Sequence, residues 1–169
     1  MAIVAGDIDF RLSGGAANSD PDAALGGAKS STELTDATLE NLFSNAPAAE
    51  SEAGSVKYRC FYVHNNHGSL ALQNAEIWIS ANTPSGDTVA AIGLGTSAVN
   101  GTEQTVADED TAPSGVTFSS ADGQDNALSI GNIPADEHKA IWVRRTISAG
   151  AGAYNPDNMV INVEGETAA

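Results

Sequence analysis

The residues of this sequence that are able to do chemistry are spread over turns and strand ends. His64 and His67 are separated by two asparagines, in the order H-N-N-H. Two imidazoles at this spacing are able to bind a metal ion, but a third ligand would have to come from elsewhere in the chain. We expect instead two histidines in a turn at the end of a strand, with no metal bound. His138 follows "IPADE" and is expected to begin a strand.

Two loops rich in carboxylates are the other candidates for a cation site. The stretch "DED" spans 108–110, and "DGQDN" spans 122–126. Calcium prefers oxygen ligands of this kind, but no glutamate closes either loop at the EF-hand spacing. The sequence therefore predicts acidic loops that are exposed to solvent, without a metal site.

No set of residues in the sequence combines a nucleophile, a base and an oxyanion donor. The nucleophile motif G-x-S-x-G does not occur, and "GLGTSAVNG" lacks the third glycine and the following helix of a dinucleotide site. In "AIWVRRT" a tryptophan precedes two arginines, which is typical of a core aromatic residue next to surface charges. We predict a protein that is not an enzyme and has no cofactor. A glycosidase stays open as an alternative, because its two distant carboxylates leave no spacing signal.

The charge balance of the chain restricts its partners. In 169 residues there are 22 Asp and Glu against 7 Lys and Arg, which gives a formal net charge of −15. Such a charge repels phosphate, so we expect no nucleic acid and no membrane as partner, and favour basic protein surfaces. Cys60 is the only cysteine, which suits a reducing cytosol. We expect no signal peptide in "MAIVAGDIDF" and no membrane span.

The residues from 56 onward show the short alternating pattern of β-strands separated by turn residues. Lys57 and Arg59 belong to "VKYRCFYVHNN", whereas Lys139, Arg144 and Arg145 belong to "HKAIWVRRTIS". If these two strands are neighbours, their side chains form one basic patch, which is a natural docking surface on an acidic body. The other predicted strands are "SLALQNAEIWISAN", joined to the first by a hairpin-type turn "NNHGS", then "TVAAIGLG", "EQTVAD", "SGVTFSS", "NALSIGNI" and "NMVINVEG".

These elements predict an all-β fold, an antiparallel β-sandwich of jelly-roll or immunoglobulin-like type, over residues 56–169. Residues 31–55 are predicted to hold one short helix, at about 35–44, which ends before Pro47, and a linker.

Residues 1–30 predict an extended N-terminal assembly arm. The stretch 9–31 contains only three large apolar side chains, those of Phe10, Leu12 and Leu25. Such a segment buries too little apolar surface to order itself. We predict that a second molecule orders it by strand addition. The expected assembly interface combines the arm with the basic patch and consists of Phe10, Arg11, Leu12, Leu25, Lys139, Arg144 and Arg145.

Four stretches carry a resemblance to a known group of proteins. They are "FRLSGGAANSDPDAALGG", "RCFYVHNNHGSLAL", "NTPSGDTVAAIGLGTSAVNGTEQTVADEDTAPSGVTF" and "IPADEHKAIWVRRT". Together they resemble small proteins encoded in the structural modules of tailed bacteriophages and prophages, and they span most of the chain. The resemblance includes no catalytic signature, so no functional residue carries over. It implies a virion component, similar in organisation to the capsid decoration (cement) proteins.

The expected function follows from this resemblance and from the arm. We expect a head decoration protein that clamps neighbouring subunits of the major capsid protein, is made in the bacterial cytoplasm and forms dimers or trimers. A tail-tube, tail-terminator or baseplate protein is one alternative. A carbohydrate-binding adhesin is another, with Trp78, Trp142, Tyr58, Tyr62 and Tyr154 as sugar platforms. The alternating strands around both tryptophans favour core positions for them instead.

Overall fold

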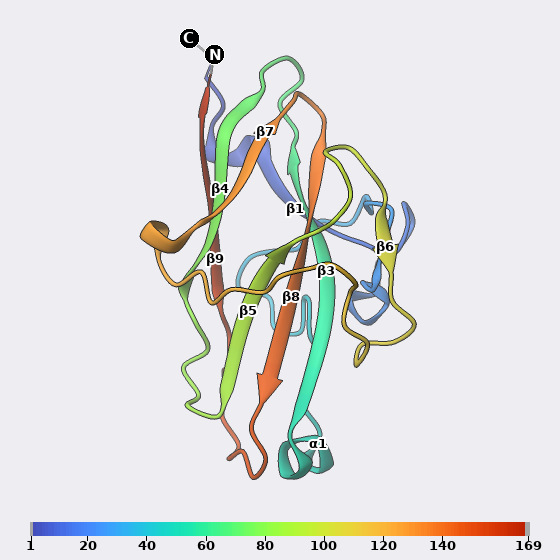
Figure 1. Cartoon of the computed structure of the whole chain (residues 1–169), viewed down its shortest axis with the longest axis vertical. Coiled ribbons are helices and arrows are strands. Elements are labelled where there is room, and N and C mark those ends of the chain that lie inside the picture. Colours follow the sequence, from blue (N-terminus) through green and yellow to red (C-terminus); the bar gives the residue numbers. More distant parts are fainter. Residues whose placement is uncertain (1, 168–169) are drawn as a thin grey trace.

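In the computed structural model, which describes residues 2–167, the chain forms two antiparallel sheets that pack face to face (Figure 1). The large sheet has the order β1 (Ile8–Leu12), β3 (Ser55–Asn65), β8 (His138–Ile147) and β5 (Thr88–Leu94). The small sheet has the order β7 (Leu128–Ile133), β4 (Leu72–Ala81) and β9 (Val160–Thr167). A short ribbon pairs β2 (Gly26–Gly27) with β6 (Glu103–Thr105). The prediction of an all-β, sandwich-like fold with antiparallel sheets is confirmed.

The main core lies between the two sheets. Period-two alternation places one face of the strands of both sheets there, as expected for packed sheets. The large sheet contributes Leu12, Phe61, Val63, Ala90, Ile92, Ile141 and Val143, and the small sheet contributes Leu72, Ala75, Ile77, Ile79 and Ile133.

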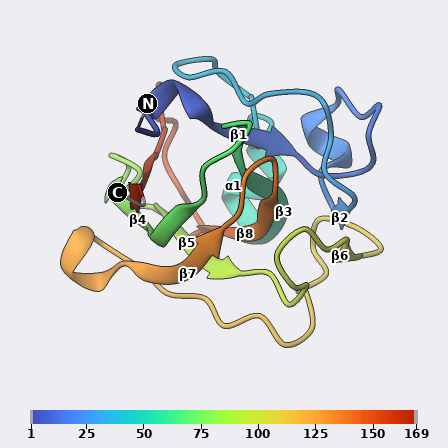
Figure 2. The ribbon, with the colours of Figure 1, turned by 90° about the horizontal axis from the view of Figure 1, so that it is seen from above.

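A second apolar cluster covers the other face of the large sheet. It contains Cys60, Tyr62, Ala140 and Trp142, together with Val106 from the loop after β6. Seen from above, the β2–β6 ribbon and β4 lie on opposite sides of β3 and β8 (Figure 2). The large sheet is therefore the middle layer of three, and it carries buried side chains on both of its faces.

The N-terminal segment belongs to the sandwich and is not an arm. β1 pairs with β3, with Phe10 opposite Val63 and Leu12 opposite Phe61. On the other side of β1, the Leu34 amide donates to the Phe10 carbonyl at 2.7 Å. Leu12 is only 2% exposed. The prediction that residues 1–30 are a separate unit ordered by a second molecule is wrong, because β3 of the same chain supplies the backbone partners that the segment needs.

Small and polar residues hold the rest of this segment. Ser13 is fully buried, and its hydroxyl accepts a hydrogen bond from the Gly26 amide at 3.0 Å. Asn18 Nδ2 donates to the Ser13 carbonyl at 2.6 Å. Gly26 has φ +93°, and a Cβ atom there would lie 1.8 Å from the Gln104 carbonyl oxygen. Hydrogen bonds and close backbone approach thus replace the bulky apolar groups that the segment lacks.

The short helix lies elsewhere than predicted. Residues 35–44 form turns, in which Ala37 and Glu40 have left-handed φ values of 57° and 60°. The α-helix of the described residues is α1 (Ala48–Ala53), so Pro47 precedes a helix and does not follow one. Proline is favoured at helix starts because it needs no amide partner there. Leu42 packs in the main core from this segment, whereas Leu39 is 67% exposed.

Most of the predicted strands are present, with two differences. Residues 114–120 form no strand, and only Ser119 makes an isolated bridge, to Ile92 of β5. The turn "NNHGS" does not close a hairpin, since β3 and β4 belong to different sheets and the turn crosses between them.

Candidate functional site

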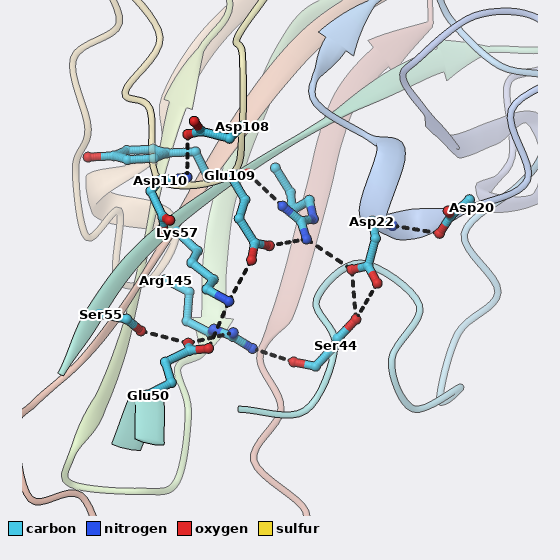
Figure 3. A network of polar contacts seen from close by, with 12 residues as sticks. Asp20, Asp22, Ser44, Glu50, Ser55, Lys57, Asp108, Glu109, Asp110 and Arg145 are labelled. Carbon is cyan, nitrogen blue, oxygen red and sulfur yellow. Dashed lines mark hydrogen bonds and ion pairs between the residues drawn. The ribbon is translucent and has the colours of Figure 1, made fainter. Parts of the chain in front are cut away.

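A network of charged side chains lies at the end of the large sheet nearest α1 (Figure 3). Lys57 on β3 is directly opposite Arg145 on β8, which confirms that the two basic strands are neighbours. Arg59 lies further along β3 on the same face and is 2% exposed. Neighbouring cations on one face repel each other, so this arrangement requires counter-charges from other elements.

Three carboxylates supply these counter-charges. Lys57 Nζ lies 2.7 Å from Glu50 Oε2 of α1 and 2.6 Å from Glu109 Oε1. Arg59 Nη2 binds the other oxygen of Glu109 and lies 2.9 Å from Asp22 Oδ1. Arg145 Nη2 lies 3.3 Å from Glu50 Oε1. Glu50 and Glu109 therefore each bridge two cations.

The pKa values show how this network holds together. Burial alone would raise the pKa of the Glu109 carboxyl, but its hydrogen bonds to Lys57 and Arg59 outweigh burial and lower that pKa. Burial would lower the pKa of Lys57, yet its bonds to Glu109 and Glu50 raise it. The network is therefore ionised at neutral pH, and it ties α1 and the loops around Asp22 and Glu109 to the large sheet.

A hollow of about 510 Å³ opens beside the charged network. Its cations already bind carboxylates, so it offers no unpaired positive charge to an anion. Within it the Ser44 hydroxyl donates a hydrogen bond to the Asp22 carboxylate at 2.6 Å, and that carboxylate also pairs with Arg59. The residues that line it are Asp22, Leu25, Ser44, Asn45, Pro47, Lys57, Arg59, Ala107, Asp108, Glu109 and Arg145.

A buried carboxylate lies under the outer layer of the large sheet. Glu103 is 3% exposed and accepts hydrogen bonds from the Ser97 amide at 2.8 Å and from Trp142 Nε1 at 3.3 Å. Burial would raise the pKa of Glu103, but these donors lower it to about 2. Glu103 thus fastens β6 and the 96–97 turn to Trp142 and has a structural role.

The histidines have structural environments too. His67 Nδ1 accepts hydrogen bonds from the amides of Ser69 and Leu70, at 3.2 and 3.0 Å, so the expectation of a turn histidine is confirmed for His67. His64 instead belongs to β3 and is 3% exposed. The His138 ring meets the Tyr62 ring edge-on at 4.9 Å, and burial lowers the pKa of His138 to about 4. Within residues 2–167, no group of three or more His, Cys, Asp or Glu side chains is placed to hold a metal ion.

The basic residues predicted for the assembly interface bind their own chain. Arg11 lies 2.6 Å from Asp9 and donates to the Ser31 carbonyl. Arg144 stacks over the Phe118 ring, with 5.3 Å between the guanidinium carbon and the ring centroid. Arg145 belongs to the charged network. Lys139 lies at the other end of β8, where its Nζ donates to the Gly95 carbonyl at 2.9 Å. The five basic residues therefore do not form one patch: Lys57, Arg59 and Arg145 come together in the charged network, whereas Lys139 and Arg144 do not join it.

The apolar members of that predicted interface are inside the protein as well. Phe10 packs against Phe61, with 5.1 Å between ring centroids. Leu12 is in the main core, and Leu25 packs on the second cluster. None of these side chains is left as a free anchor.

The sequence pattern missed the carboxylates that complete the site. Glu109 was expected in a solvated acidic loop, yet it bridges Lys57 and Arg59. Basic residues on two strands that are expected to be neighbours do indicate that carboxylates must lie nearby. Nothing in the spacing identifies Asp22, Glu50 and Glu109 as the residues that provide them, because they come from three distant segments.

The aromatic residues proposed as sugar platforms are mostly internal. Trp142 and Tyr62 are fully buried, and Trp78 is 8% exposed, which confirms the core positions expected for both tryptophans. Tyr154 is exposed, in the loop between β8 and β9.

Comparisons with protein-family models, with curated proteins and with solved structures found no match. Among the described residues, no helix is both long and apolar enough to cross a membrane.

Proposed function

We propose that this chain is a non-enzymatic structural protein of a phage virion, namely a head decoration protein that binds the major capsid protein. One observation carries the proposal: the chain uses its basic side chains internally. All of them except Lys29 have ionic, hydrogen-bond or aromatic partners within the chain. The remaining carboxylates dominate the exterior of a molecule with a net charge of −15.

An exterior of this kind favours docking on a basic protein surface, because complementary charge speeds association and excludes wrong partners. The resemblance to phage structural proteins supports a virion surface as the place where this docking occurs. Since β1 is part of the sandwich, the proposed attachment is through the folded body and not through an arm. Many copies on one shell strengthen a weak individual contact, and a dimer or trimer remains the expected assembly state.

The proposal is tested on tailed-phage particles purified from the bacterium that encodes the chain. We expect quantitative mass spectrometry to find the chain in the particles at hundreds of copies, and immunogold labelling to mark the head. Particles that lack the chain would contradict a virion role.

A tail-tube or tail-terminator protein is the second candidate. The observation that favours it is the long outer edge of β9, beside which residues 2–167 place no other strand, since ring-forming subunits often join through their sheets. Labelling of the tail, with copy numbers in multiples of three or six, would support this candidate over decoration.

A further inference from the structure

The outer edge of β9 is open. Among the described residues, β9 pairs with β4 on one side and with no strand on the other. Near its end, the Ile3 amide donates to Thr167 Oγ1 at 3.0 Å, a contact with a side chain. An edge of this kind presents unpaired amide and carbonyl groups, which are a template for another strand.

The other sheet edges are protected. The backbone of β1 is bonded on its outer side to Thr32 and Leu34, and β5 exchanges hydrogen bonds with Ser119, both at 2.9 Å. β7 carries its own bulge next to Gly131, which has φ +84°. In the β4–β9 pair the extra residues lie in β4, so β9 itself is regular. Bulges and covering segments are the usual ways of blocking an edge, and β9 has neither.

The side chains of β9 are less buried than those of its partner strand. Ile161 and Val163 face the core but are only half-buried, whereas their partners on β4, Ile79 and Ile77, are 2% and 0% exposed. A further strand beside β9 would cover the apolar surface that these two residues still expose.

The outward side of β9 is acidic. Glu164 is directly opposite Glu76 of β4, and Glu166 follows two positions along. Their neighbours are neutral amides: Gln124 Nε2 lies 2.7 Å from Glu164, and Asn74 Nδ2 lies 3.1 Å from Glu166. Like charges directly opposite each other destabilise a sheet, so the edge favours a partner that brings positive charge.

We propose that the outer edge of β9 binds an extended basic segment of another protein, which adds to the small sheet as a fourth strand. Backbone hydrogen bonds to the edge supply affinity, and Lys or Arg at alternate positions of the segment pairs with Glu164 and Glu166. The inference goes beyond the proposed function, since it holds for any partner protein that offers such a segment.

A second copy of this chain fits the edge poorly. Each copy has a net charge of −15, and antiparallel pairing of two β9 strands would bring the glutamates of one copy close to those of the other. Repulsion between them opposes such a dimer.

The test uses the full chain and a synthetic peptide that alternates Lys with Thr. The peptide has about ten residues, at the long end of the usual range for a strand. The control peptide has the same sequence with N-methylation at every residue, lysines and threonines alike, so it keeps the charge but has no amide on either edge to pair as a strand. We expect only the first peptide to bind and to slow hydrogen exchange of alternate β9 amides.

The matched variants keep the total charge change equal. Glu164→Lys with Glu166→Lys should weaken binding by about tenfold or more, because two charge contacts are lost. Asp36→Lys with Glu52→Lys, on exposed positions outside β9, should bind like the native chain. Both variants should keep a cooperative thermal unfolding transition.

Three results would overturn the proposal. In the first, the peptide gives no protection at β9. In the second, the N-methylated peptide binds equally well, which would mean that charge alone is recognised. In the third, sedimentation shows that the chain by itself is a dimer whose β9 amides are already protected, so that a second copy occupies the edge.

Discussion

The large and the small sheet of this protein differ in how far the rest of the chain covers their faces and edges. The large sheet has buried clusters on both faces, and its outer strands β1 and β5 are bonded to neighbouring segments. The charged network fastens further segments to one end of it. The small sheet buries one face in the main core and leaves the regular strand β9 open on its outer side. The difference indicates that the large sheet carries the stability of the fold and that the small sheet is the side available to partners.

Removal of residues 1–30 should have the largest effect. It deletes β1 and β2, uncovers one edge of β3 and removes Leu12 from the main core. We expect the truncated chain to lose its cooperative thermal transition, followed by circular dichroism. A truncated chain that still unfolds cooperatively near the native midpoint would show that the large sheet does not need this segment.

Leu12→Ala and Val163→Ala compare the two sheets at single side chains. Leu12 is 2% exposed, so its truncation should cost about 2–5 kcal/mol of unfolding free energy. Val163 of β9 is half-buried and should cost about 1 kcal/mol or less. Urea unfolding measures both values. Equal losses of unfolding free energy in the two variants would contradict the difference in burial between the large and the small sheet.

Glu109→Gln tests the charged network. The change removes a carboxylate that bridges Lys57 and the buried Arg59, and leaving these cations less well paired should cost about 1–3 kcal/mol. The neighbouring Asp110→Asn removes the same charge from an exposed side chain and should stay within about 0.5 kcal/mol of the native chain. Urea unfolding at matched salt distinguishes them, and similar values for both variants would contradict a role of the network in stability.

The outer layer of the large sheet should respond to acid through His138. Burial lowers the pKa of His138 to about 4 from an ordinary value of 6.5. The unfolded chain therefore takes up this proton before the folded one, and stability falls as the pH drops from 6.5 through 4. The urea midpoint measured across this range should decline less in His138→Gln than in the native chain. An unchanged slope would show that His138 does not titrate in this way.

Glu76→Gln should have the smallest effect and the opposite sign. It removes one of two like charges that face each other across β4 and β9, and it should stabilise the fold by roughly 0.2–1 kcal/mol at low salt. Added salt should reduce this gain, because exposed charges are screened. A gain that is independent of salt would point to a cause other than repulsion.

The sequence predicts the strands well from residue 55 onward, because alternating apolar residues there reflect direct packing between sheets. The N-terminal segment is not predictable in the same way. Its order depends on Ser13, Asn18 and the close approach of Gly26 to Gln104, which are contacts between distant positions. Leu42 shows the converse problem, because it has helical spacing but packs on the sandwich from a turn.

Only the basic residues of the candidate site could be predicted from the sequence. Basic residues on two strands suggested a patch, and β3 and β8 do pair. Their counter-ions come from three segments that only the fold brings together. A pattern of charges along the chain records neither which strands are neighbours nor which loops return to them.

Cys60, enclosed beneath the β2–β6 layer, has a practical consequence. Its side chain has no exposed surface, and burial raises the pKa of the thiol well above its ordinary range. An alkylating reagent can therefore reach the sulfur only while the overlying layer is lifted. The rate of that modification therefore reports how often the layer over Cys60 opens. It can be measured on the native cysteine, without introducing a probe by mutation.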